Sequence, residues 1–286
     1  MEILFQTPLV LVGLIGLLGL MVGSFLNVVI HRLPIMMERG WRRECRDYLG
    51  LSAPAGESEP TFNLALPRSH CPVCGKTLSP LENIPIVSYV WLKGRCSACQ
   101  TRISIRYPAV EWLTGLLSMA VAWKFGPSVQ LCWALLLTWG LVALSLIDLD
   151  KQLLPDDITL PLLWLGQLLS VFNVFSNATE SILGTLGGYL ILWTVYQLFK
   201  LTTGKEGMGY GDFKLLAMLG AWLGWASLPL IIVLSSVVGA LSGVVMILLF
   251  DHDRRVPIPF GPYLALAGWL TLLFGDSIMN AYLASF

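Results

Sequence analysis

The chain has 286 residues, of which 56% are hydrophobic and only 13% are charged. Soluble domains usually carry about a quarter charged residues, so this composition excludes an ordinary soluble domain and predicts a membrane protein that crosses the bilayer several times. The formal net charge is zero, so the overall charge gives no indication of nucleic-acid binding.

Apolar segments long enough to cross a bilayer alternate with polar connections along the chain. No basic region or small-residue cleavage site accompanies the first apolar run, which predicts a retained membrane anchor rather than a signal peptide. The sixth run is short, and we expect it to pack inside the bundle. We predict an all-α membrane protein with about eight transmembrane helices: Pro8–Ile30, Pro108–Trp123, Val129–Ile147, Ile158–Phe175, Ile182–Phe199, Phe213–Trp225, Leu228–Phe250 and Phe260–Leu283.

The basic residues indicate the orientation, because Lys and Arg concentrate in cytoplasmic segments of membrane proteins. If the N-terminus lies outside, the segments 31–106, 148–157, 200–214 and 251–257 lie inside. Those segments hold 17 of the 18 Lys and Arg residues, and only Lys124 lies outside. This distribution predicts that the long polar segment faces the cytoplasm.

Two CxxC pairs in this polar segment indicate a metal site. Disulfides are disfavoured in a reducing cytoplasm, and no βαβ pattern surrounds the pairs to indicate a thioredoxin-like redox motif. The pairs are separated by 21 residues, a spacing that predicts a closed, structural zinc site with four thiolate ligands: Cys71, Cys74, Cys96 and Cys99. Cys132 is expected to pack within a span, and the roles of Cys45 and His70 stay open.

Two groups of acids end up at the same membrane face under this topology. Asp148 and Asp150 end the third span and face different sides of a helix. Asp156 and Asp157 precede the fourth span and have an ordinary alternative role as helix caps. Asp212 opens the sixth span and could likewise cap that helix and complement its dipole.

Three glycines before Asp212, at positions 207, 209 and 211, exceed what a cap requires. Glycine lets another backbone approach closely and permits positive φ, so an extended peptide beside this loop could reach the carboxylate. Two neighbouring carboxylates can share one proton, so that one partner activates water while the other polarises a scissile carbonyl. The sequence contains no HExxH and no GxSxG to indicate another hydrolase mechanism.

An ion-coupled transporter that uses the same acids is the alternative of a different class. Transporters tend to show repeated halves with acids near the bilayer midplane, whereas this chain shows no repeat and places both acids at one face. A zinc-bearing scaffold without catalysis would leave the glycine-flanked Asp212 unexplained.

The chain resembles the type IV prepilin peptidases of bacteria in motifs that follow one another along its whole length. The element Gly209-Tyr210-Gly211-Asp212 follows "IDLDKQLLPD". Presenilin-type and signal-peptide-peptidase-type proteases share the GxGD element, but they carry a C-terminal PAL motif that this sequence does not contain. The other matching motifs are "GSFLNVVIHRLP" at 23–34, the paired CxxC motifs, "ENIPIVSY" at 82–89, "RYPAVEW" at 106–112 and "PIPFGPYL" at 257–264.

The resemblance implies a bifunctional enzyme of the bacterial inner membrane with its active site facing the cytoplasm. Such an enzyme cleaves the basic leader of prepilins and pseudopilins after a glycine, and methylates the new N-terminus with S-adenosylmethionine. The family pattern places the catalytic acids at Asp148 and Asp212, with Gly209 and Gly211 in the active-site loop. Membrane lipid is then the surrounding medium, and nucleic acid is not a partner.

The methyl-donor site has no clear signal in the sequence. No GxGxxG follows a strand, and the polar segment is too short for a usual Rossmann domain. Weak candidates near the cysteines are Glu82, Asn83, Lys93 and Gly94. We therefore divide the chain into a first transmembrane helix at 1–30, a cytoplasmic zinc domain associated with methylation at 31–106, and a transmembrane aspartic peptidase bundle at 107–286.

Overall fold

The computed structural model describes residues 8–51, 61–249 and 258–284. The chain forms two compact units, Met1–Gly126 and Pro127–Phe286, and each is described by itself. Phe250, at the predicted end of the seventh span, and the basic segment at 251–257 lie outside the described residues, as do residues 1–7.

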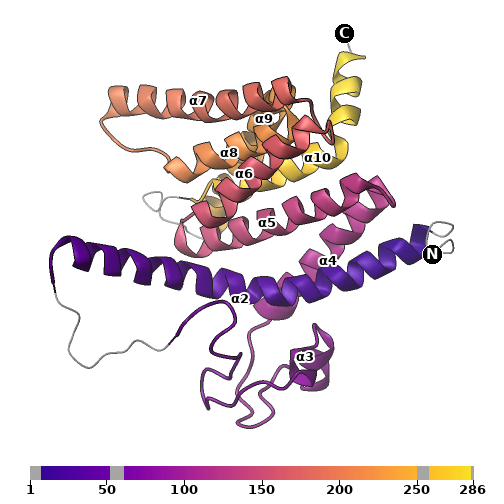
Figure 1. Ribbon diagram of the computed structural model, residues 1–286, viewed down its shortest axis with the longest axis vertical. Helices are drawn as coiled ribbons and strands as arrows, with labels where there is room; N and C mark the ends of the chain where they lie inside the picture. The colour runs from indigo at the N-terminus through magenta and orange to yellow at the C-terminus, as the bar shows by residue number, and fades with distance from the viewer. Residues whose placement is uncertain (1–7, 52–60, 250–257, 285–286) are drawn as a thin grey trace. The chain divides into compact units, whose positions relative to one another are not determined.

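The first unit is built on two helices, α2 (Pro8–Tyr48) and α4 (Arg106–Phe125), which pack against each other (Figure 1). Glycines on α2 allow a close approach: a Cβ at Gly23 would lie 2.7 Å from the Cα of Glu111 on α4. Small residues at helix interfaces in membranes let backbones approach in this way. The predicted first span ends at Ile30, yet α2 continues to Tyr48 as a single helix that contains Pro34.

Between α2 and α4 the chain forms short elements around the cysteines. These are a 3₁₀ turn η1 (Leu81–Asn83) and a single-turn helix α3 (Val87–Trp91). Two isolated antiparallel bridges, His70 with Thr77 and Arg95 with Arg102, are the only strand pairing in the described part of the chain. The buried guanidinium of Arg32 on α2 donates to the carbonyl oxygens of Asn63 and Pro67, at 2.9 and 2.6 Å, and so ties this region to the helix.

The second unit is a bundle in which α8 (Tyr210–Leu223) forms the centre. It packs against α6 (Asp156–Val171), α7 (Ala178–Thr203) and α10 (Gly261–Leu283) (Figure 1). Trp222 of α8 is buried, and its indole N–H donates to the carbonyl oxygen of Leu162 at 2.8 Å. The remaining elements are α5 (Val129–Lys151), η2 (Trp225–Ser227) and α9 (Leu228–Leu249). The expectation that the short sixth span packs inside the bundle is confirmed.

Five helices in the described residues are long and apolar enough to cross a membrane. They are α2, α5, α7, α10 and the segment Trp225–Met246, which comprises η2 and most of α9. The predicted all-α class of membrane protein, with a four-cysteine cluster after the first helix, is therefore confirmed at this level.

Glycines also set the contact between α7 and α8, and this contact gives a testable prediction. A Cβ at Gly188 would lie 2.6 Å from the carbonyl oxygen of Leu216, which is backbone and cannot rotate away. Gly188→Ala is therefore expected to lower the free energy of unfolding by about 1–3 kcal/mol. Thermal unfolding in detergent measures this loss.

Gly187→Ala is the matched control on the same helix. Its Cβ would meet only the end of the Leu228 side chain, at 3.2 Å, and a side-chain end can move. Equal unfolding midpoints for the two variants would contradict the proposed backbone contact.

Candidate active site

Asp148 lies in the last turn of α5, where that helix ends in a left-handed Gln152. Its side chain is buried, with 6% of the residue exposed. The backbone N–H of Gly261, the first residue of α10, donates to Asp148 Oδ2 at 3.0 Å. Asp150 is exposed, so the two acids face different sides of the helix as the sequence predicts.

Asp212 lies in the first turn of α8, three residues after Gly209, the residue that precedes the helix. It is 7% exposed, and its carboxylate lies close enough to that of Asp148 for their charges to interact. Gly209 is the N-cap, and Asp212 lies in the first turn of α8, where a carboxylate complements the helix dipole, so the helix-end role that the sequence offered for Asp212 stays open beside the catalytic one. The structure thus brings together two buried acids that are 64 residues apart in the sequence numbering.

The glycines before Asp212 serve close approach rather than an unusual backbone conformation. None of the three has a positive φ, so the expectation that glycine is needed there for a left-handed backbone is wrong. A Cβ at Gly211 would lie 2.8 Å from the Cβ of Leu154, and a Cβ at Gly207 would lie 2.8 Å from the Phe199 ring. The surroundings of Gly209 are open, with Asp212 Oδ2 at 3.9 Å from its Cβ position.

Asp156 forms an ion pair between α6 and α8 instead of capping a helix. Pro155 is the N-cap of α6, so the cap alternative for Asp156 is wrong. Its carboxylate accepts from Lys214 Nζ of α8 at 2.7 and 2.8 Å. This exposed ion pair is worth little by itself, but it joins the first turn of α6 to α8 at a position two residues after Asp212.

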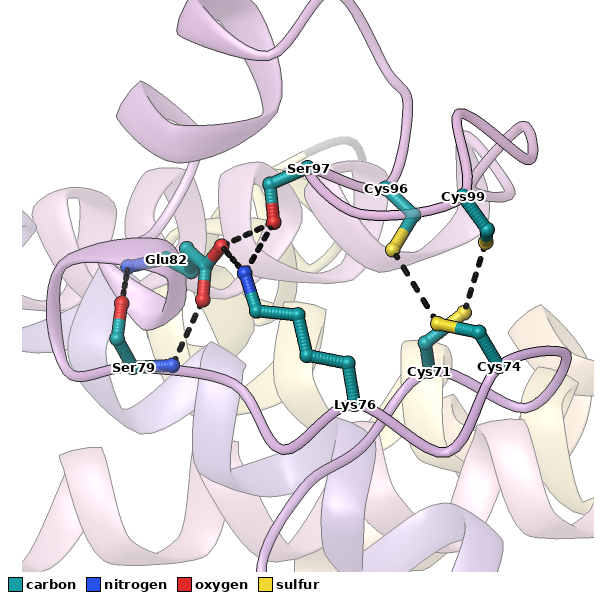
Figure 2. A network of polar contacts seen from close by, with 8 residues as sticks. All are labelled: Cys71, Cys74, Lys76, Ser79, Glu82, Cys96, Ser97 and Cys99. Atoms are coloured by element: carbon teal, nitrogen blue, oxygen red, sulfur yellow. Dashed lines mark hydrogen bonds and ion pairs between the residues drawn. The ribbon is translucent and has the colours of Figure 1, made fainter.

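The four cysteines of the two CxxC pairs form one cluster in the first unit. All four Sγ atoms lie within 4.8 Å of one another, with Cys71 to Cys99 at 3.7 Å and Cys74 to Cys96 at 3.9 Å (Figure 2). Tetrahedral zinc with Zn–S bonds of about 2.3 Å requires sulfur pairs about 3.8 Å apart, so the donor set fits the ion.

Both CxxC loops have the same backbone geometry. The N–H after each pair, at Gly75 and Gln100, donates to the carbonyl of the first cysteine at 3.0 Å. Both of these residues have positive φ, which favours glycine at 75 and strains glutamine at 100. Hydrogen bonds with the side chain and backbone of Thr101 lower the pKa of Cys99 to about 6, and the thiolate is the form that binds metal.

A polar network joins the two CxxC loops through Glu82 (Figure 2). Lys76 Nζ donates to Glu82 Oε1 at 2.9 Å and to Ser97 Oγ at 2.6 Å. Ser97 Oγ also donates to Glu82, and the backbone N–H of Ser79 donates to Glu82 Oε2 at 2.8 Å. The Ser79 N–H, with Ser97 and Lys76, lowers the pKa of Glu82 to about 2.

The other methyl-donor candidates are not among the residues of this network. Asn83 borders a hollow of about 330 Å³ together with Arg68 and Ser69. Lys93 and Gly94 are consecutive left-handed residues, and a Cβ at Gly94 would lie 2.9 Å from the Tyr89 ring. Backbone geometry and packing thus account for Gly94, and a role in methyl-donor binding stays a prediction for all four candidates.

Sequence reasoning missed Glu111, a buried acid on α4 that is 8% exposed. Its Oε2 accepts the backbone N–H of Ile86 at 2.8 Å. Ile86 has φ of +60°, which is strained for a β-branched residue, and the buried carboxylate holds this conformation in place. A lone acid within the apolar part of "RYPAVEW" is the signal that could have identified it.

The network around Glu82 predicts a specific pH dependence. The pKa of Glu82 in the folded chain is about 2, below its ordinary value of 4.5, so its carboxylate stabilises the fold above pH 4.5 and loses this effect as the pH falls towards 2. Glu82→Gln should therefore lower the unfolding temperature by the same amount at every pH from about 8 to about 5. A difference from wild type that vanishes by about pH 6 would contradict the network.

Two family models match the chain, one in each compact unit. The Bacterial Peptidase A24 N-terminal domain matches residues 17–125, and the Type IV leader peptidase family matches residues 135–244. The first match contains the cysteine cluster, and the second contains Asp148 and Asp212.

Curated relatives match over the full length. A protein of Aeromonas hydrophila named Prepilin leader peptidase/N-methyltransferase is 56% identical over 286 residues, which is 100% of this chain and 98% of the relative. Proteins with the same name from Stutzerimonas stutzeri and Pseudomonas aeruginosa are each 58% identical over 283 residues, which is 99% of this chain and 97% of each relative. No solved structure matches the chain.

Proposed function

Because this chain belongs to the family of prepilin leader peptidase/N-methyltransferases, we propose that Asp148 and Asp212 cut the leader from prepilins and pseudopilins after a glycine. The same protein then methylates the new N-terminal amine. The observation that carries the assignment of the two acids is their meeting as buried carboxylates in the unit that matches the leader peptidase model. Family membership removes the transporter alternative.

The peptidase step needs one ionised and one protonated aspartate. The ionised carboxylate accepts a proton from water, and the water oxygen attacks the carbonyl carbon of the glycine before the cut. The protonated partner donates a hydrogen bond to the developing oxyanion. The C–N bond then breaks, and the leaving amine takes up a proton that the dyad has held.

We propose eight membrane crossings, with the active site at the cytoplasmic face of the bacterial inner membrane. In support, each predicted span overlaps a described helix, including the shorter or less apolar α4, α6 and α8, although α6 ends at Val171 and not at Phe175. Burial of α8 by its neighbours explains why it need not be apolar over a full bilayer length. The distribution of Lys and Arg supports the orientation.

We propose that Cys71, Cys74, Cys96 and Cys99 hold a structural zinc ion and that S-adenosylmethionine supplies the methyl group. Four thiolates leave zinc no open position for water, so the ion would fasten the two CxxC loops. The cysteine cluster lies in the unit that the Bacterial Peptidase A24 N-terminal domain matches and the aspartates lie in the unit that the Type IV leader peptidase family matches, which supports the assignment of cleavage to the second unit. Methylation requires that the new amine lose a proton and attack the methyl carbon, which breaks the S–C bond of the sulfonium and leaves a thioether.

Incubation of the purified enzyme with a prepilin, with and without S-adenosylmethionine, tests this proposal directly. Mass spectrometry should show the mature pilin after loss of its leader in both reactions. Only the reaction with the methyl donor should add one methyl group. An intact prepilin in both reactions would refute the proposal.

A further inference from the structure

A backbone amide from the last helix reaches the catalytic region. Gly261 is buried at the start of α10 and lies 113 residues after Asp148, yet its N–H donates to Asp148 Oδ2 at 3.0 Å. A Cβ at position 261 would lie 2.6 Å from that same oxygen. Only glycine brings this amide so close to the carboxylate without pushing it away.

Leu154, in the connection between α5 and α6, lies between two glycine backbones. A Cβ at Gly211 would lie 2.8 Å from Leu154 Cβ, and a Cβ at Gly261 would lie 3.1 Å from Leu154 Cδ2. Leu154 is buried, with 9% exposed. The Leu154 side chain therefore packs against the start of α8, next to Asp212. It also packs against the start of α10, where the Gly261 N–H donates to the Asp148 carboxylate.

We propose that Gly261 and Leu154 are positioning residues of the peptidase. The Gly261 amide fixes the orientation of the Asp148 carboxylate, and Leu154 sets its separation from Asp212. This inference rests on the proposed function, since it requires the two aspartates to carry out the cleavage. Rates depend steeply on such geometry, because a displacement of about 1 Å can cost about 10²-fold.

Helix packing is the competing explanation for Gly261, and α10 provides a control for it. Gly268 lies two turns further along, and a Cβ there would lie 2.5 Å from the Leu219 side chain. Both positions are thus tight, but only the one at Gly261 touches a carboxylate. If both glycines serve packing alone, substitution by alanine should change kcat by similar factors at the two positions. If Gly261 positions Asp148, kcat should fall in Gly261→Ala and not in Gly268→Ala.

The test measures kcat and KM for cleavage of a prepilin by Gly261→Ala and Gly268→Ala. We expect Gly261→Ala to lower kcat by about 10²-fold with KM within about threefold of wild type, and Gly268→Ala to keep kcat within about threefold. Equal kcat in Gly261→Ala and wild type, or equal losses in both variants, would overturn the inference.

Leu154 provides a second measurement that decides the matter if Gly261→Ala fails to fold. Leu154→Ala should lower kcat by about tenfold, and the volume-conserving Leu154→Met should restore it to within about threefold of wild type. Full activity in Leu154→Ala, or no rescue by Leu154→Met, would overturn the role of Leu154. An active Asp148→Asn would instead refute the proposed function itself, so the two failures are distinguishable.

Discussion

Asp148→Asn and Asp212→Asn should each lower kcat for leader cleavage by at least about 10³-fold, because an amide cannot move the proton that general acid–base catalysis requires. Asn keeps the volume of the side chain, and its carbonyl oxygen can still accept the N–H of Gly261 at position 148. Both variants should therefore insert into the membrane and fold. Single-turnover cleavage of a prepilin, followed by mass spectrometry, measures the loss.

The double variant and an exposed neighbour complete this experiment. Because both acids serve one proton transfer, Asp148→Asn combined with Asp212→Asn should cleave no more slowly than either single variant. Asp150→Asn makes the same chemical change two residues away at an exposed position, so it should keep kcat within about threefold of wild type. Cleavage at the wild-type rate by either single variant of the pair would show that the acid is not catalytic.

The second large effect is expected at the cysteines. Cys71→Ser and Cys96→Ser each remove a buried ligand, so bound zinc should fall from about one equivalent per chain to almost none. Because the cluster lies in the first unit, methylation should fall far more than cleavage. Elemental analysis measures the metal, and the masses of the mature pilin report both activities in one sample.

Cys45→Ser and Cys132→Ser are the matched controls, since both cysteines are exposed and lie outside the cluster. The exposure of Cys132 on α5 also shows that the expectation of core packing for this residue is wrong. Each should retain zinc and both activities. Absence of zinc from freshly purified, reduced wild type would refute the metal site. Equal loss of both activities in a well-folded Cys71→Ser would refute the separation of methylation from cleavage.

Hydropathy identifies the helices of this chain well, because the bilayer demands runs of apolar residues. It does not locate the end of α2, since the polar residues after Ile30 stay helical beyond the apolar run. An exposed Glu38–Arg42 pair at helical spacing, with its charged atoms 3.7 Å apart, indicates why such a polar segment can remain a helix. The hydropathy pattern there indicates where the apolar segment ends, but it does not indicate where the helix ends.

The candidate site is predictable only where its chemistry is carried by local motifs. Asp148 and Asp212 end or begin apolar runs, and the cysteines come in pairs, so each is recognisable within a few residues. The amide of Gly261 carries no such signal, because its partner lies 113 residues away. The contact of Glu111 with Ile86 is likewise not predictable, because the two residues are 25 positions apart and Ile86 adopts a positive φ that isoleucine does not favour.

The length of α2 as a single continuous helix determines how much of it lies outside the bilayer. At 1.5 Å per residue its 41 residues measure about 60 Å, twice the hydrocarbon thickness of about 30 Å. Even at a tilt of about 40° such a rod cannot be submerged from end to end. The polar C-terminal part of α2 therefore extends beyond the hydrocarbon layer. The exposed thiol of Cys45 lies in this part, so reagents too hydrophilic to enter the bilayer should label it.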